Sequence, residues 1–305
     1  MNFKEQLHQK VNHIEEVLVR FLPEEAGYQK TVLEAMNYSV MAGGKRLRPM
    51  LMEECFTLFG GVGELVYPFM AALEMIHNYS LVHDDLPAMD NDEYRRGRKT
   101  TWTVYGDGMA VLAGDGLLNL AYETAAKAFD MAENETELKR VAKALQILGK
   151  KAGVYGMIGG QTADIEAEES KNPLTEELLL FIHENKTAAL IQAAMMIGAV
   201  LAGADNEAVL KMEKAAYNIG IAFQIQDDIL DVTSTTEVLG KPVGSDEKNH
   251  KLTYVSLKGL DRAREDVKRL SEEAIDILTS YSGDEGNREN TFLLELTTSL
   301  ITRKK

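Results

Sequence analysis

The stretch TAALIQAAMMIGAVLAGA, residues 187–204, carries no charged side chain. A segment of this length and apolarity could cross a bilayer as a helix. It contains Gln192, however, and no aromatic residue of the kind that marks a membrane interface. A helix that is apolar on every side is typical of the interior of a large helical protein. The stretch therefore predicts a fully buried helix in a helical bundle and no stable insertion into a membrane.

The rest of the chain repeats the helical pattern. Apolar residues recur at helical spacing in residues 3–21, before Pro23 closes the segment, and alternating strand patterns are scarce. No linker rich in Pro, Ser or Gly divides the chain, and no internal repeat is visible. These features predict an all-α fold, a large helical bundle formed by a single domain over residues 1–305. Further helices are expected over residues 28–41, 48–59, 64–85, 109–131, 136–156, 175–203, 206–232, 260–280 and 288–301.

The chain is acidic, with 48 Asp and Glu residues against 33 Lys and Arg residues and a formal net charge of -15. Such a charge repels nucleic acid, so we expect no nucleic-acid partner, and an anionic substrate would need a local cluster of basic side chains. The one cysteine, Cys55, cannot form an intramolecular disulfide, which suits a reducing compartment. The N-terminal segment mixes charges throughout and lacks the pattern of a signal peptide. We therefore expect a cytoplasmic protein.

Acidic and basic side chains are separated along HDDLPAMDNDEYRRGRKT, residues 83–100. A regular helix would point Asp84 and Asp90 in different directions, because six residues separate them. Pro87 disfavours helical backbone at Leu86 and permits a bend there. The bend is expected to bring Asp90 back towards Asp84. Carboxylates at the C-terminal end of a helix also oppose its dipole, so this cluster is costly unless cations neutralise it.

A second acidic cluster, DDILD at residues 227–231, follows Gln224. On a helix, Asp227 and Asp231 share a face, which places two like charges together. Mg²⁺ prefers a few carboxylates combined with waters and substrate phosphates. The two clusters therefore predict a diphosphate held between them through Mg²⁺, and two solvated acidic surfaces are the alternative.

The segment GGKRLRP, residues 43–49, carries the basic counterpart. A flexible glycine pair precedes Lys45 and Arg48, which lie three residues apart and could both hold a second phosphate group. An ordinary basic helix start is the alternative interpretation.

The set of motifs resembles that of the trans-isoprenyl diphosphate synthases, in particular the bacterial farnesyl diphosphate synthase type, over essentially the whole chain. In that family two aspartate-rich motifs face one another across the central cavity of an isoprenoid synthase-type helical fold. They are matched by Asp84, Asp85 and Asp90 (DDxxxxD) and by Asp227, Asp228 and Asp231 (DDxxD). Further matches are GGKRLRP, FQIQDDILD, Arg95-Arg96, Lys186-Thr187 and Gly240-Lys241. The resemblance implies a single polyprenyl synthetase domain that forms a homodimer.

The resemblance also implies the reaction. It is a Mg²⁺-dependent head-to-tail condensation of dimethylallyl or geranyl diphosphate with isopentenyl diphosphate, which proceeds by ionisation, condensation and elimination. The products are (2E,6E)-farnesyl diphosphate and diphosphate. The departing diphosphate removes the final proton, so no protein base is assigned.

Roles for individual residues follow by similarity. The principal Mg²⁺ ligands would be Asp84, Asp90 and Asp227, supported directly or through water by Asp85, Asp228 and Asp231. The allylic diphosphate would be contacted by Arg95, Lys186 and Lys241. The carbocation would be stabilised by the hydroxyl of Thr187 and the amide oxygen of Gln224. Isopentenyl diphosphate would occupy a basic niche formed by Gly44, Lys45, Arg48, His77 and Arg96. Gln161 and Asp164 are expected to line the cavity or orient metal-bound water, and helix capping explains them nearly as well.

Two residues on the helix before Asp84 concern product length. Tyr79 and Ser80 lie five and four residues before Asp84, about 6 to 7.5 Å deeper along a regular helix. In the resembled family, a bulky aromatic residue at the first of these positions, together with extra residues in the first motif, goes with fifteen-carbon products, and Tyr79 and the Pro87-Ala88 pair match this pattern. Tyr79 is therefore expected to form the floor of the cavity for the growing chain.

Other functions compete with this one. A geranyl or geranylgeranyl diphosphate synthase would share the chemistry and differ in the floor. A class I terpene cyclase also uses an aspartate-rich motif and Mg²⁺, but lacks the GGKRLRP-type site. An HD-type metal phosphohydrolase is suggested by His77, His83 and Asp84, and leaves the second aspartate motif unexplained. A helical interaction subunit without enzymatic activity would carry the same motifs in a degenerate site.

Overall fold

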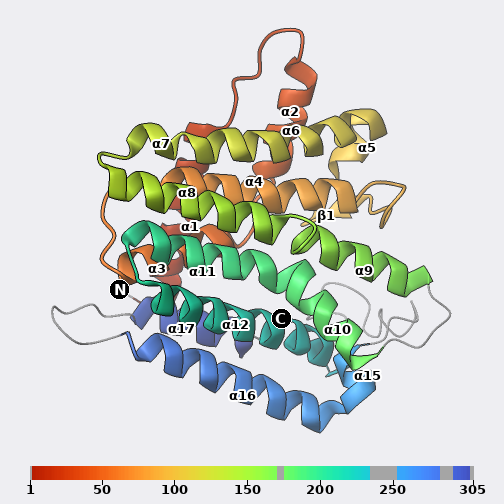
Figure 1. The fold of residues 1–305 in the computed structure, drawn as a ribbon. Coiled ribbons are helices and arrows are strands. Elements are labelled where there is room, and N and C mark those ends of the chain that lie inside the picture. The colour runs from red at the N-terminus through yellow and green to blue at the C-terminus, as the bar shows by residue number, and fades with distance from the viewer. Residues whose placement is uncertain (1, 170–174, 234–252, 282–290, 303–305) are drawn as a thin grey trace. The chain divides into compact units, whose positions relative to one another are not determined.

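The computed structural model describes residues 2–169, 175–233, 253–281 and 291–302, and the fold is all-α (Figure 1). Across these residues the strands are confined to one two-stranded hairpin, β1 (Tyr94–Arg95) and β2 (Arg98–Lys99). The chain divides into two compact units. The N-terminal unit comprises Met1–Leu145 and Val200–Gly203, and the C-terminal unit comprises Gln146–Ala199 and Ala204–Lys305. The single domain expected over residues 1–305 stays a prediction.

The N-terminal unit is built around the buried helix α4, which contacts α1, α2, α3 and α6. Its helices are α1 (Phe3–Phe21), α2 (Lys30–Val40), α3 (Leu47–Leu58), α4 (Tyr67–Asp84), α5 (Thr101–Tyr105), α6 (Asp107–Ala126) and α7 (Ala128–Met131). Helices α4 and α6 approach closely because α6 presents small residues. A Cβ atom at Gly114 would lie 2.0 Å from Nε2 of His83. The absence of that Cβ lets the imidazole bond to the carbonyl of Val111, 3.1 Å away.

The C-terminal unit is built around α12, which contacts α15, α16, α17 and the π-helical turn η1. Its elements are α9 (Met157–Glu169), α10 (Glu176–Ile182), η1 (His183–Ala188), α12 (Asn206–Thr233), α15 (Tyr254–Lys258), α16 (Leu260–Thr279) and α17 (Thr291–Ile301). Two further helices contribute residues to both units, namely α8 (Glu135–Ala152) and α11 (Ala189–Ala202).

The uncharged stretch 187–204 lies mainly in α11, at the end of the helical run Glu176–Ala202. This run is the one helix among the described residues that is long and apolar enough to cross a membrane. In the structure, 78% of its most apolar window is buried, as in the core helix of a soluble protein. The prediction of a buried helix is therefore confirmed.

The observed helices depart from the sequence-based prediction in several places. The expected helix 109–131 is divided into α6 and α7, and the expected helix 175–203 contains the π-helical turn η1. Helices α5, α9 and α15 and the hairpin were not predicted from the sequence. Glycine disfavours helix interiors, and α9 contains Gly159 and Gly160. Packing explains one of them, because a Cβ atom at Gly160 would lie 2.1 Å from the backbone nitrogen of Lys186 in η1.

This contact predicts that Gly160→Ala destabilises the protein. The added methyl meets rigid backbone, so we expect a loss of about 1 to 3 kcal/mol in the free energy of unfolding. Chemical denaturation followed by circular dichroism measures it. The matched control is Gly108→Ala in α6, where a Cβ atom would meet nothing within 4 Å. An equal loss in both variants would show that the contact between α9 and η1 is not the cause of the lower free energy of unfolding.

Candidate functional site

The first aspartate motif lies where α4 ends and the chain folds back on itself. The last residue of α4 is Asp84, and the backbone N–H of Asp90 donates a hydrogen bond of 2.8 Å to the Asp84 carbonyl. The expected bend after α4 is therefore confirmed, and it brings the two residues together. The side chain of Asp84 is half-buried and that of Asp90 is exposed.

Asp85 is the buried aspartate of the motif, and it pairs with Arg95. Its Oδ1 atom lies 2.7 Å from both Nε and Nη2 of Arg95. Burial raises the pKa of the Asp85 carboxyl above its ordinary value, although the guanidinium of Arg95 acts in the opposite direction. Arg95 was expected to face a diphosphate, and in the structure it holds Asp85.

The hairpin that carries Arg95 turns sharply through two residues. Strands β1 and β2 are antiparallel, with Arg95 opposite Arg98. The connecting residues Arg96 and Gly97 have φ values of 54° and 76°, and both are positive as a tight type I′ hairpin turn requires. The strained backbone of Arg96 directs its guanidinium to the carbonyl of Gly43. Gly44 has a φ of 144°, in the region that favours glycine, and a Cβ atom there would also lie 2.6 Å from that guanidinium.

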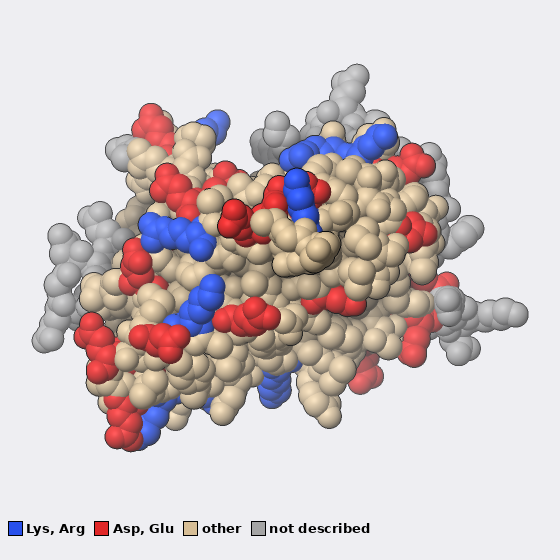
Figure 2. All heavy atoms as spheres, turned by 90° about the horizontal axis from the view of Figure 1, so that it is seen from above, with Lys and Arg blue, Asp and Glu red and all other residues tan. Residues whose placement is uncertain are grey.

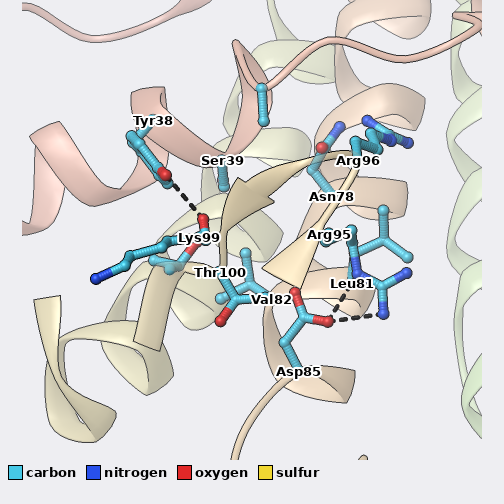
Figure 3. A pocket seen from close by; sticks show the side chains of 12 residues that line it. Tyr38, Ser39, Asn78, Leu81, Val82, Asp85, Arg95, Arg96, Lys99 and Thr100 are labelled. Carbon is cyan, nitrogen blue, oxygen red and sulfur yellow. Dashed lines mark hydrogen bonds and ion pairs between the residues drawn. The ribbon is translucent and has the colours of Figure 1, made fainter. Parts of the chain in front are cut away.

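Figure 3 shows a small cavity between α2, α4 and the hairpin. Its volume of about 30 Å³ matches the space of a single water molecule. The Tyr38 hydroxyl donates to the Lys99 carbonyl at 2.7 Å on one side, and the pair of Asp85 and Arg95 lies on the other. The cavity is too small for a prenyl substrate. It is a packing gap beside the hairpin, whose residues Arg95, Arg96 and Lys99 line it.

Basic side chains gather around the GGKRLRP segment, where Arg48 and His77 are half-buried and Arg96 is exposed. Burial lowers the pKa of Arg48 to about 10, with Glu74 acting against the shift and Arg96 adding to it. Burial also lowers the pKa of His77 well below its ordinary value, and the charges of Arg48 and Arg96 lower it further. The Nε atom of Arg48 is buried and has no hydrogen-bond partner among the described residues. An anion in this cluster would relieve both the repulsion and the missing hydrogen bond.

Within the same segment Arg46 serves the fold. Its side chain is fully buried, with Nη1 3.0 Å from Oε1 of Glu74 and Nη2 2.8 Å from the Val40 carbonyl. Lys45, the preceding residue, is exposed. Sequence analysis did not assign Glu74, because a lone acidic residue in an apolar helix carries no signal of its partner.

The residues expected to set product length lie on the buried part of α4. Tyr79 is 6% exposed, and its ring lies edge-on to His83 with centroids 5.8 Å apart. Its hydroxyl has no hydrogen-bond partner within the described part of the chain. Burial raises the pKa of Tyr79 to about 12, with smaller contributions from Tyr122 and Asp84. The Ser80 hydroxyl donates to the carbonyl of His77 at 2.9 Å.

The second aspartate motif lies near the C-terminal end of α12. Asp227 is exposed, Asp228 is half-buried and Asp231 is 2% exposed. Asp227 and Asp231, expected on one face, therefore differ in their access to solvent. The Oδ2 atom of Asp228 accepts a hydrogen bond of 2.6 Å from the backbone N–H of Tyr254. Gln224, one turn before the motif, is half-buried.

The Lys186-Thr187 pair lies in η1, and π-helical turns often occur at functional sites. The Nζ atom of Lys186 is 2.5 Å from Oδ2 of the buried residue Asp164 in α9. Asp164 is therefore the ion-pair partner of Lys186. Helical spacing could not predict this pair, because the two residues lie on different elements. Thr187 and Gln161 are half-buried. Gly240 and Lys241 lie outside the described residues.

The acidic residues fit Mg²⁺ as hard oxygen donors, although those that the structure describes form no complete cage. Among the described residues, no group of three or more His, Cys, Asp and Glu side chains is arranged to hold a metal ion. Mg²⁺ usually takes one or two carboxylates and completes its shell with waters and phosphates. The solvent-accessible carboxylates that suit this role are Asp84 and Asp90 in the N-terminal unit and Asp227 in the C-terminal unit.

Comparisons with known proteins agree with the motifs. A family model described as polyprenyl synthetase matches residues 29–284. The farnesyl diphosphate synthase of Geobacillus stearothermophilus is 41% identical over 259 residues, 85% of each chain. The geranylgeranyl diphosphate synthase of Cyanophora paradoxa is 42% identical over 268 residues, 88% of this chain and 87% of the relative. The crystal structure of an FPP/GFPP synthase from Zymomonas mobilis superposes with a TM-score of 0.85 at 31% identity, covering 98% and 99% of the two chains.

The buried histidine at the start of η1 predicts a dependence of stability on pH. Burial lowers the pKa of His183 to about 4, although Asp164 acts to raise it. The unfolded chain therefore binds a proton near pH 6.5 that the folded chain binds only near pH 4. The contribution of His183 to the free energy of unfolding is therefore retained above about pH 6.5 and lost as the pH is lowered towards 4. The loss is about 2 kcal/mol at pH 5.

Denaturation at pH 7 and pH 5 should show this loss in the wild type and a smaller loss in His183→Gln. The control His8→Gln alters an exposed histidine on α1 and should keep the wild-type loss. Identical losses in the wild type and His183→Gln would contradict the assignment.

Proposed function

We propose that this chain, which belongs to the polyprenyl synthetase family, makes (2E,6E)-farnesyl diphosphate from isopentenyl diphosphate and dimethylallyl or geranyl diphosphate. Prenyl transfer follows from the family, whose substrates are allylic diphosphates and isopentenyl diphosphate. The relatives are named for fifteen- and twenty-carbon products. The observation that favours farnesyl diphosphate is the bulky, buried Tyr79 five residues before Asp84. Family membership argues against the HD-type phosphohydrolase.

Isopentenyl diphosphate is proposed to bind at the cation cluster of the N-terminal unit. Arg48, in the first turn of α3, offers a buried, unsatisfied Nε–H, and the exposed Lys45 lies three residues before it in the loop that precedes the helix. Arg96 is held against the glycine pair that includes Gly44. His77 stays neutral beside these cations, so it can accept or donate a hydrogen bond without adding to their repulsion.

The allylic diphosphate is proposed to bind where the two aspartate motifs supply carboxylates. Bound Mg²⁺ would neutralise the charge that develops on the leaving diphosphate. Asp84, Asp90 and Asp227 would hold it, and Asp85, Asp228 and Asp231 would support them. Because Arg95 is paired with Asp85, its proposed contact with the diphosphate would be made by the same guanidinium that orients this carboxylate. Lys241 belongs to the same proposal.

The chain's own residues stabilise charge on both sides of the breaking bond. Asp164 holds the ammonium group of Lys186, so that its charge is already oriented before the diphosphate arrives. The hydroxyl of Thr187 and the amide oxygen of Gln224 are dipoles that stabilise an allylic cation without trapping it as a nucleophile would. The departing diphosphate takes the final proton.

A cytoplasmic homodimer is the proposed form of the enzyme. Helix α6 exposes the apolar side chains of Val111 and Leu112, and α5 exposes Val104, which is the kind of surface that a second copy covers. The net charge of -15 disfavours nucleic acid as a partner.

Product analysis tests the proposed function directly. Incubation with dimethylallyl and isopentenyl diphosphates and Mg²⁺ should yield farnesyl diphosphate, and removal of Mg²⁺ with a chelator should stop the reaction. A twenty-carbon product would contradict the farnesyl assignment while keeping prenyl transfer. Failure to release diphosphate under any condition would favour the non-enzymatic helical subunit.

The role of Tyr79 predicts a change in product length. Tyr79→Ala removes the bulk that stops the growing chain and should shift the products to twenty carbons or more, whereas Ser80→Phe adds bulk nearer to Asp84 and should shorten them. Chromatography of the dephosphorylated alcohols measures both.

The matched control is Tyr79→Phe, which keeps the ring and removes a hydroxyl without a described hydrogen-bond partner. It should keep the fifteen-carbon product. If Tyr79→Ala also stops at fifteen carbons, another residue forms the floor.

A further inference from the structure

The short helix α15 is tied by hydrogen bonds and an ion pair to three other helices of the C-terminal unit. The backbone N–H of Tyr254 donates to Asp228 of α12 at 2.6 Å, and the hydroxyl of the same residue donates to Asp266 of α16 at 2.9 Å. At the other end of α15, Lys258 lies 2.5 Å from Glu176 of α10. One residue, Tyr254, therefore connects a carboxylate of the second aspartate motif to a buried carboxylate of α16.

Asp266, which accepts the hydrogen bond from the Tyr254 hydroxyl, is itself held in place by other side chains. It is 4% exposed, and its two carboxylate oxygens accept further hydrogen bonds from Arg262 at 3.0 Å and Arg269 at 3.1 Å. Burial acts to raise the pKa of Asp266, but hydrogen bonds from Arg269 and Tyr254 outweigh it, and the net shift is downward. Asp266 is thus an ionised acceptor, and hydrogen bonds to ionised groups are the stronger ones.

The local backbone fixes the direction of the Tyr254 N–H. Thr253 and Ser256 form a capping box, in which each side chain bonds to the backbone N–H of the other at 3.2 and 2.9 Å. As the first residue of α15, Tyr254 has no hydrogen-bond acceptor within its own helix. Its N–H is directed instead to the Asp228 carboxylate.

The surroundings of Tyr254 suit a test by substitution, because its hydroxyl can be removed without disturbing the packing of the ring. The ring packs in the apolar cluster that includes Ile225 and Ile229 of α12. Beside it lies a cavity of about 210 Å³, bordered by α10, α12, α15 and α16. Substitution by Phe therefore keeps the apolar contacts and introduces no clash.

We propose that Tyr254 is a positioning residue for the metal site. Its backbone N–H fixes the rotamer of Asp228, and the hydrogen bond from its hydroxyl to Asp266 fixes the position of Tyr254. This inference rests on the proposed function, in which Asp228 supports bound Mg²⁺. A metal-ligating carboxylate is usually oriented by a hydrogen bond from a neighbour, and loss of such a neighbour commonly weakens metal binding by about 10- to 100-fold.

The sharpest test replaces Tyr254 by its α-hydroxy analogue, which keeps the ring and hydroxyl and removes only the N–H. Two readouts are compared with the wild type: the Mg²⁺ concentration that gives half-maximal prenyl transfer, and binding of Mn²⁺ with inorganic diphosphate, followed by electron paramagnetic resonance. We expect both to weaken by about tenfold, with the KM for isopentenyl diphosphate unchanged. Tyr254→Phe should give a smaller shift in the same direction.

The control is Tyr217→Phe, which deletes a hydroxyl from the same cavity and leaves both bonds of Tyr254 in place. It should match the wild type in both readouts. Wild-type metal dependence in the α-hydroxy variant would overturn the inference, as would reduced transfer with unchanged Mn²⁺ binding.

The proposed function can fail separately. If the wild type binds Mn²⁺ and diphosphate but makes no prenyl product, the catalytic proposal falls, and the Mn²⁺ comparison still decides the role of Tyr254. If the wild type binds no Mn²⁺, both proposals fall.

Discussion

The buried ion pair between Arg46 and Glu74 holds the basic part of the site together. Both side chains are removed from water, and removing one partner of such a pair commonly costs about 3 to 5 kcal/mol because the other charge is left buried. Arg46 also donates to the carbonyl of Val40, which fixes the loop between α2 and α3. Glu74 further attracts Arg48 and Arg96, so one carboxylate balances the cations that would otherwise repel one another. The niche can therefore remain cationic in an acidic protein.

Glycines allow close contacts between helices in both units. Gly114 admits the imidazole of His83 between α4 and α6, and Gly160 admits the backbone of η1 against α9. The second contact keeps Lys186 near Asp164, since these residues lie on the same two elements. In both places the absence of a Cβ atom allows the contact, and the contact at Gly160 lies beside a residue of the proposed site, Lys186.

Sequence reasoning predicted features that depend on local order. It predicted the buried helix 187–204 and the bend that returns Asp90 to Asp84, because charge content, helical spacing and Pro87 are all readable along the chain. It did not predict the pairs formed by Asp85 with Arg95 or by Lys186 with Asp164. Those pairs depend on tertiary packing, and an acidic residue gives no sign of which of several bases it will meet. Helix α9 was missed for a related reason, since its two glycines weaken a helix locally and only the tertiary contact of Gly160 with η1 explains one of them.

The two aspartate motifs share one arrangement, although they lie in different units and on different local structures. In each adjacent pair, the second aspartate is held by a donor of the protein: Asp85 by the guanidinium of Arg95, and Asp228 by the N–H of Tyr254. The first aspartate of each pair, Asp84 or Asp227, is more exposed than its neighbour. A hydrogen-bonded carboxylate of the protein interior has a fixed direction, whereas a more solvent-accessible one can exchange water for a metal ion at a smaller cost in desolvation. Adjacent aspartates would then be required because one orients the site while the other binds, which a single carboxylate cannot do at once.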